Sequence, residues 1–166
     1  MYNTVSRSIN FITICAQGHK CLFGDISRSG AMELSEAGKI VERLWNQLPK
    51  KFLNIELDQF VVMPNHIHGI VVSIKSKRSV LAGMKRANDS KNQTPIAEII
   101  RTFKVESADL IHTTVTRKFE WQRNYTLELI STEDELIKIR KEIKDNPVDW
   151  DFDPENTAKR GSVIEH

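Results

Sequence analysis

Apolar residues in this chain follow two spacings, one that suits strands and one that suits helices. Four segments rich in β-branched and aromatic residues are predicted to be strands: 9–15, 55–63, 67–74 and 126–130. Three segments with apolar residues three or four positions apart are predicted to be amphipathic helices: 36–48, 95–111 and 133–146. The order is therefore strand, helix, strand, strand, helix, strand, helix.

Residues at the helix ends support these assignments. Ser35 can cap the first helix, and Pro49 is expected to end it. Thr132 and Glu135 have the spacing of a capping box at the start of the last helix, and Pro147 is expected to stop that helix.

The order of elements predicts the fold. It is the order of a ferredoxin-like, split βαβ protein. We therefore expect an α+β fold with an antiparallel sheet, helices on one face and an added C-terminal helix. At 166 residues the chain is expected to form one domain, residues 1–156, followed by a tail, residues 157–166.

Composition narrows the class of protein further. With 40% hydrophobic and 28% charged residues, the chain is typical of a soluble globular protein. No apolar run is long enough to span a membrane and the N-terminus has no signal-peptide core, so we expect a cytoplasmic protein with no membrane partner. Cys15 and Cys21 are too few for a disulfide framework, and Cys15 is expected to act as a small buried hydrophobe.

The segment 75–94 differs from the rest of the chain. It holds six basic residues against one acidic residue, among them Lys85 and Arg86, and it has few large apolar groups. Two interpretations stay open: simple disorder, or a mobile basic arm that closes on a phosphate backbone.

Two histidines, His66 and His68, are separated by a single residue at the centre of the chain's most β-rich stretch. On a strand, residues i and i+2 point to the same face, so both rings could hold one divalent ion between them. A chance pair of core histidines is the alternative. The break at residues 63–65 just before the pair favours a functional site, because irregular backbone often accompanies function.

Six blocks of sequence, in order, carry a resemblance to a known family. They are FITICAQGHKCLFGDI, LSEAGKIVERLWNQLP, VVMPNHIHGIVV, PIAEIIRTFK, EWQRNY and ELIKIRKEIKDNPVDW. Together they resemble the single-tyrosine transposases with a histidine-hydrophobe-histidine (HUH) motif, in particular the REP-associated tyrosine transposases. The resemblance implies the same fold, single-stranded or hairpin DNA as partner, and Mg²⁺ or Mn²⁺ held by His66, His68 and a third ligand, Asn146.

The chain departs from this family at the nucleophile. In the family a tyrosine stands four residues before the matching asparagine, and here that position is Glu142. Glu142 and Asn146 share a helix face, so a glutamate there could bind the same cation or act as a general base. It cannot form a phosphotyrosine. Of the two tyrosines, Tyr125 is expected to pack rather than react, and Tyr2 lies in the N-terminal end segment.

A set of basic and aromatic residues could bind DNA. Lys85, Arg86, Arg101, Lys104 and Arg123 could contact phosphates, and Trp121 could stack on an unpaired base. Singly, each is as well explained as a solvated charge or a core aromatic. Three functions remain open: metal-dependent strand transfer, DNA binding without cleavage, and hydrolysis assisted by Glu142. A homodimer is also possible, since some single-tyrosine transposases share a site between two chains.

Overall fold

The computed structural model describes residues 5–76 and 94–157. Its centre is a four-stranded antiparallel sheet in the order β4-β5-β1-β6. The strands are β1 (Val5–Cys15), β4 (Ile55–Val62), β5 (His66–Ser76) and β6 (Thr126–Ile130). This order confirms the predicted ferredoxin-like plan, because the first strand lies between the third and the fourth.

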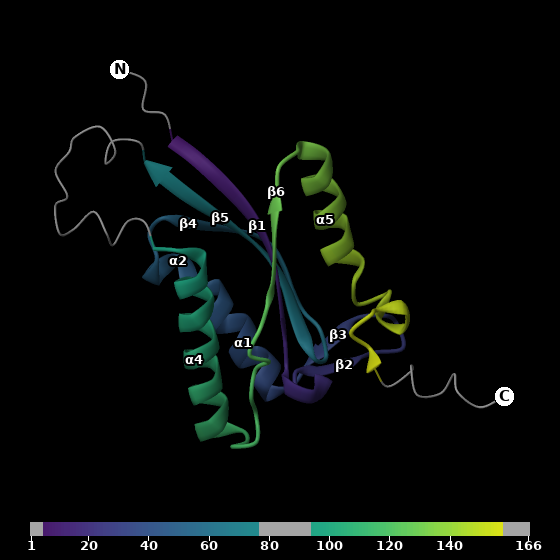
Figure 1. Cartoon of the computed structure of the whole chain (residues 1–166). Coiled ribbons are helices and arrows are strands. Elements are labelled where there is room, and N and C mark those ends of the chain that lie inside the picture. Colours follow the sequence, from purple (N-terminus) through teal and green to yellow (C-terminus); the bar gives the residue numbers. More distant parts are fainter. Residues whose placement is uncertain (1–4, 77–93, 158–166) are drawn as a thin grey trace.

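Helices cover both faces of the sheet (Figure 1). Helices α1 (Glu36–Asn46) and α4 (Ile96–Thr114) pack together over one face, and α5 (Glu133–Asp145) lies over the other. Strand residues alternate between the two faces, so Ile12, Ile14 and Ile67 join the larger core under α1 and α4. Phe11 and Ile70 join the smaller core under α5.

The predicted start of the last helix is confirmed, whereas the predicted end of the first helix is wrong. Thr132 and Glu135 form the predicted capping box at the start of α5. The prediction that Pro49 ends the first helix is wrong, since α1 ends at Asn46 and Pro49 lies in the first turn of α2 (Leu48–Lys51). Proline fits there because the first turn of a helix leaves its backbone N–H groups without intrahelical partners.

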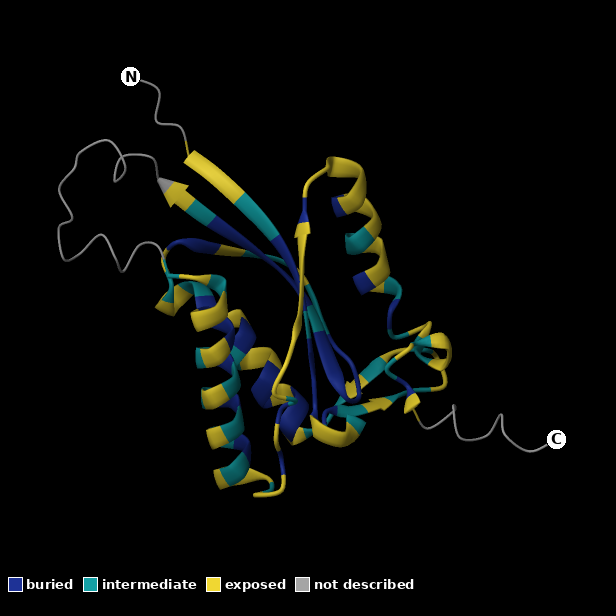
Figure 2. Cartoon of the chain, viewed as in Figure 1, coloured by how far each residue is buried: buried dark blue, intermediate teal, exposed yellow. Residues whose placement is uncertain are grey.

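Two short strands, β2 (Gly24–Ile26) and β3 (Met32–Leu34), form a separate hairpin that the sequence pattern does not reveal. Strand β6 is an edge strand whose residues are exposed except for Ile130, as Figure 2 shows. Helix α5 covers one face of the sheet, while the edge formed by β6 is exposed.

A close contact at Gly69 sets the position of α1 against the sheet. A Cβ atom at Gly69 would lie 2.3 Å from Cζ2 of Trp45. The Trp45 ring stacks on Phe60 with ring centroids 4.8 Å apart. The residue after the histidine pair is therefore glycine because the tryptophan occupies the space of a side chain.

After α5 the chain returns to the sheet. Residues 146–157 include the 3-10 turn η3 (Trp150–Phe152), and Asn156 is buried. The segment 77–93, with Lys85 and Arg86, and the tail from residue 158 lie outside the described residues, as does Tyr2. No helix among the described residues is long and apolar enough to cross a membrane.

Candidate metal centre

The two histidines of β5 face each other across a short gap. His68 pairs with Thr13 and His66 pairs with Cys15 in the register of β1 and β5, so all four side chains project from one face of the sheet. The Nε2 atoms of His66 and His68 are 3.1 Å apart. The prediction that both rings look the same way is therefore met by the geometry.

A hydrogen bond to the other nitrogen orients each ring. Nδ1 of His66 donates to the amide oxygen of Asn65 at 2.8 Å, because an amide oxygen can only accept. This leaves Nε2 of His66 unprotonated, so its lone pair can accept from Nε2–H of His68 at 3.1 Å or bind a metal ion in its place. Nδ1 of His68 lies 2.8 Å from the Thr13 hydroxyl, which can accept or donate, so His68 can also present a free Nε2.

Both imidazoles are held in the neutral form. Burial lowers the pKa of His66 well below its usual value, and the neighbouring His68 and His19 lower it further. Burial likewise lowers the pKa of His68 to about 4, although Glu155 opposes this change. Neutral imidazole is the form that binds a metal ion, so both rings are ready ligands near neutral pH.

A third potential ligand is Asp153, which the sequence analysis missed. Its Oδ2 atom is 3.6 Å from Nε2 of His66, and its side chain is only 5% exposed. Burial raises the pKa of Asp153, a hydrogen bond from the backbone N–H of Glu155 opposes this, and the negative charges of Glu155 and Glu142 raise the pKa further. The ligand atoms of His66, His68 and Asp153 all lie within 4.8 Å of one another.

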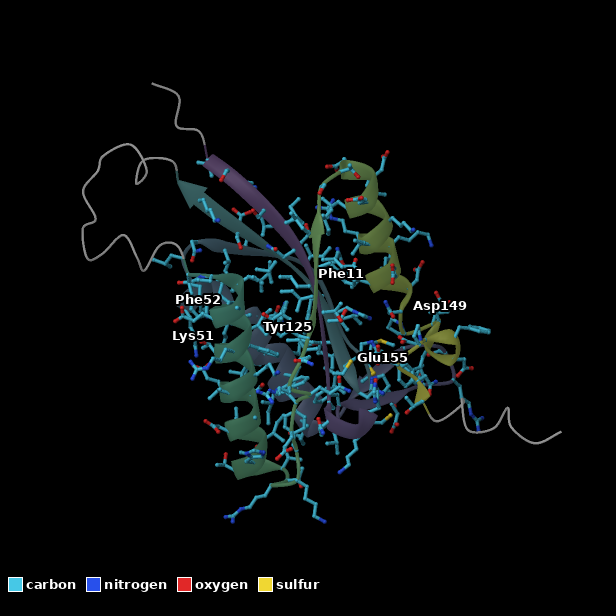
Figure 3. All side chains as sticks on the ribbon, viewed as in Figure 1. Phe11, Lys51, Phe52, Tyr125, Asp149 and Glu155 are labelled. Carbon is cyan, nitrogen blue, oxygen red and sulfur yellow. The ribbon has the colours of Figure 1, made fainter. Side chains whose placement is uncertain are left out.

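His68 and Asp153 line a cavity of roughly 400 Å³ at the end of α5, whereas His66 is fully buried and does not line it. Its lining includes the predicted site residues His68, Glu142 and Asn146, together with Asp149 and Glu155. Figure 3 labels Asp149 and Glu155 beside the end of α5. Three residues singled out in the sequence thus line one cavity, and the fold adds acidic residues from the segment after α5.

Asn146 lines the same cavity as His68 and Asp153. It is buried, and its Nδ2 donates to the backbone carbonyl of Glu142 at 2.8 Å. Within the described part of the chain its Oδ1 atom has no hydrogen-bond partner. The amide oxygen is therefore left to accept a hydrogen bond or bind a cation.

The donor set fits a divalent cation. Two ligands about 2.1 Å from one ion, at right angles, are about 3 Å apart, which matches the separation of the two Nε2 atoms. Imidazole together with carboxylate and amide oxygens suits Mn²⁺ or Zn²⁺ better than Mg²⁺, which takes oxygen ligands. A buried carboxylate beside two neutral imidazoles also lacks the positive charge that a cation would supply.

The predicted DNA-binding residues do not gather at this cavity. Trp121 is 8% exposed, and its Nε1 donates to the Ser107 hydroxyl, so the prediction that it stacks on a base is wrong. Lys104 donates to the backbone carbonyls of residues 122 and 123, which ties it to the fold. Arg101 and Arg123 are exposed.

No tyrosine among the described residues lines the cavity. Tyr125 stands just before β6 and is 36% exposed, so its side chain lies at the surface and outside the core. Figure 3 labels it apart from Glu155. The neighbouring residue of β6, Thr126, does line the cavity. Successive strand residues face opposite ways, which explains the difference.

Comparison with known proteins finds one relative by sequence and a solved structure of similar fold. The chain is 34% identical over 158 residues to an uncharacterized protein of Haemophilus influenzae strain Rd, a match that covers 92% of this chain and 87% of that protein. The chain therefore belongs to the same family as the Haemophilus protein. No protein-family model matches the chain.

The solved structure of a REP-associated tyrosine transposase bound to a REP hairpin is similar to this chain with a TM-score of 0.57. The match covers 89% of this chain and 70% of the transposase, at 15% sequence identity. The chain thus shares the fold of that transposase, and the resemblance found in the sequence extends to the fold.

Proposed function

We propose that this protein binds single-stranded or hairpin DNA through a divalent cation held by His66, His68 and Asp153. The observation that supports this best is the 3.1 Å approach of the two histidine Nε2 atoms beside a cavity. DNA is proposed as the partner because the solved structure of similar fold is a transposase bound to a DNA hairpin. The six sequence blocks of the same family add to this argument.

The charge of the cavity explains why a cation is needed. Four acidic residues line it, and none of its described lining residues is lysine or arginine: Glu142, Asp149, Asp153 and Glu155 supply the negative charge. A phosphate would be repelled by these groups alone. A bound divalent cation would offset two of these negative charges and act as a Lewis acid toward a phosphoryl oxygen.

Each residue has a proposed part in holding the phosphate. Asn65 and Thr13 fix the two imidazoles, so that their lone pairs converge without reorganisation. Asn146 offers an amide oxygen from the last helix as a further ligand. Because α5 is fixed to the sheet by two hydrogen bonds from Arg140 to the Asp58 carboxylate, this helix can hold that ligand in place.

Strand transfer through a tyrosine is disfavoured by the lining of the cavity, which contains no phenol among the described residues. A second function, hydrolysis of a phosphodiester, is supported by the presence of Glu142 in the lining. Its carboxylate would take a proton from an attacking water, and the leaving oxygen would receive a proton from solvent. No covalent protein–DNA intermediate forms in either case.

The test uses labelled hairpin DNA, with Mn²⁺ or with EDTA, on native and denaturing gels. We expect retarded DNA with Mn²⁺ and at least about tenfold weaker binding with EDTA or in His68→Asn. His112→Asn is the matched control, because His112 contacts the Phe119 carbonyl and does not line the cavity. Equal binding by His68→Asn and His112→Asn would refute the proposal.

The denaturing gel separates the two candidate functions. Intact DNA supports binding alone, and shortened DNA that is lost in Glu142→Gln supports hydrolysis. A band of protein joined to DNA in the unaltered chain would contradict both. Glu142→Tyr restores the residue type of the family and is expected to create that band.

A further inference from the structure

A second group of potential ligands, Cys15, His19 and Glu155, adjoins the histidine pair. The thiol, imidazole and carboxylate atoms of these residues lie within 4.8 Å of one another. Cys15 is 7% exposed, and His19 and Glu155 are partly buried. None of the three belongs to the ligand set expected from the sequence.

The fold brings the three residues together from distant parts of the chain. Cys15 ends β1 and lies directly opposite His66 in the strand register. The 3-10 turn η1 (Gln17–His19) follows at once, and His19 has a φ of 52°, a backbone conformation that residues other than glycine seldom adopt. Glu155 arrives from the segment after α5.

Hydrogen bonds already hold the group in place. Nε2 of His19 is 2.9 Å from Oε2 of Glu155. Burial, followed by the negative charge of Glu155, raises the pKa of Cys15 to about 12, and its thiol hydrogen-bonds to Glu155. The three side chains thus meet at one carboxylate.

One amide connects this group to the histidine pair. Nδ2 of Asn65 donates to the backbone carbonyls of His19 and Glu155, at 3.3 and 2.8 Å. Oδ1 of the same residue accepts from His66. A buried side chain, 1% exposed, therefore fixes both ligand groups at once.

We infer that Cys15, His19 and Glu155 form a second metal site, which binds a zinc-like divalent cation beside the site of the histidine pair. A thiolate and an imidazole select a softer ion than oxygen ligands do, and zinc accepts carboxylate as well. Three protein ligands leave one position of a tetrahedral ion for water. The Cys15 thiol gives its proton to solvent when the metal–sulfur bond forms.

The second site would also organise the first. Asp153, a proposed ligand of the histidine pair, stands two residues before Glu155. Ligation of Glu155 to residues at the end of β1 would fasten the segment after α5 to the sheet. The second cation would thereby hold Asp153 beside His66.

Cobalt provides the test, because a Co²⁺–thiolate bond has a charge-transfer absorption that Co²⁺ bound only by imidazole and oxygen ligands lacks. Metal-free full-length protein is titrated with Co²⁺ and its absorption is recorded. In a second titration, with Zn²⁺, the number of metal ions bound per chain is measured. We expect the absorption in the unaltered chain, its loss in Cys15→Ser, and a strongly reduced signal in His19→Asn. Circular dichroism checks that each variant is folded.

Two controls make the assignment specific. Cys21→Ser removes the exposed cysteine and is expected to keep the full absorption. His68→Asn disables the histidine pair and is also expected to keep it, so this inference can fail or succeed independently of the proposed DNA function. If the absorption is absent, survives in Cys15→Ser or disappears in Cys21→Ser, the second site is refuted.

Discussion

Mild acid should destabilise the metal-free protein through His68. Burial lowers the pKa of this residue from 6.5 to about 4 in the folded chain. Between these two values the unfolded chain binds a proton that the folded chain does not. Folding stability therefore rises with pH across this window and falls as the solution is acidified.

The size of the effect follows from the two pKa values. The two pKa values differ by about 2.5, and a pKa difference of one corresponds to about 1.36 kcal/mol. Below both values, His68 therefore lowers the free energy of unfolding by about 3 kcal/mol. At about pH 5 only part of this is lost, about 2 kcal/mol relative to about pH 7.5. His66 adds to the effect in the same direction.

The assay is urea unfolding in EDTA, at about pH 7.5 and about pH 5, of the unaltered chain and of His68→Asn. The asparagine keeps a polar group near Thr13 but does not titrate. We expect the unaltered chain to lose about 2 kcal/mol more than the variant between the two pH values. An equal loss in both proteins would show that the buried ring is not the cause.

Three further predictions concern other parts of the fold. Gly69→Ala places a methyl group against Trp45 and should lower the free energy of unfolding by about 1–3 kcal/mol, measured by urea unfolding. Thr132→Ala removes the cap of α5 and should cost about 1 kcal/mol in the same assay. Asn65→Ala should weaken Mn²⁺ binding about 10–100-fold by calorimetry. Asn10→Ala, which removes another buried amide with two hydrogen bonds, should leave Mn²⁺ affinity unchanged.

Local patterns predicted the parts of the fold that depend on local physics. The capping box at Thr132 and the strand from Thr126 to Ile130 were recovered at the positions predicted. Pro49 was misassigned because proline is compatible with both the end of one helix and the first turn of the next. Hairpin strands of three residues, such as β2, are too short to show a period.

Only the part of the candidate site that depends on local strand geometry could be predicted from the sequence. His66 and His68 share a face by strand geometry alone, whereas Asp153 and Glu155 reach them through the path of the chain after α5. Only the acidic run that follows the helix could have drawn attention to these two carboxylates. Trp121 was misjudged because a tryptophan beside basic residues has the same local pattern in a core as on a surface.

An anomalous X-ray difference map from a crystal of this protein soaked with Mn²⁺ tests the central claim most directly. We expect a peak about 2.2 Å from Nε2 of both His66 and His68, with Asp153 as a further neighbour. A map with no peak within reach of the two rings, in crystals where those rings are ordered, would contradict it.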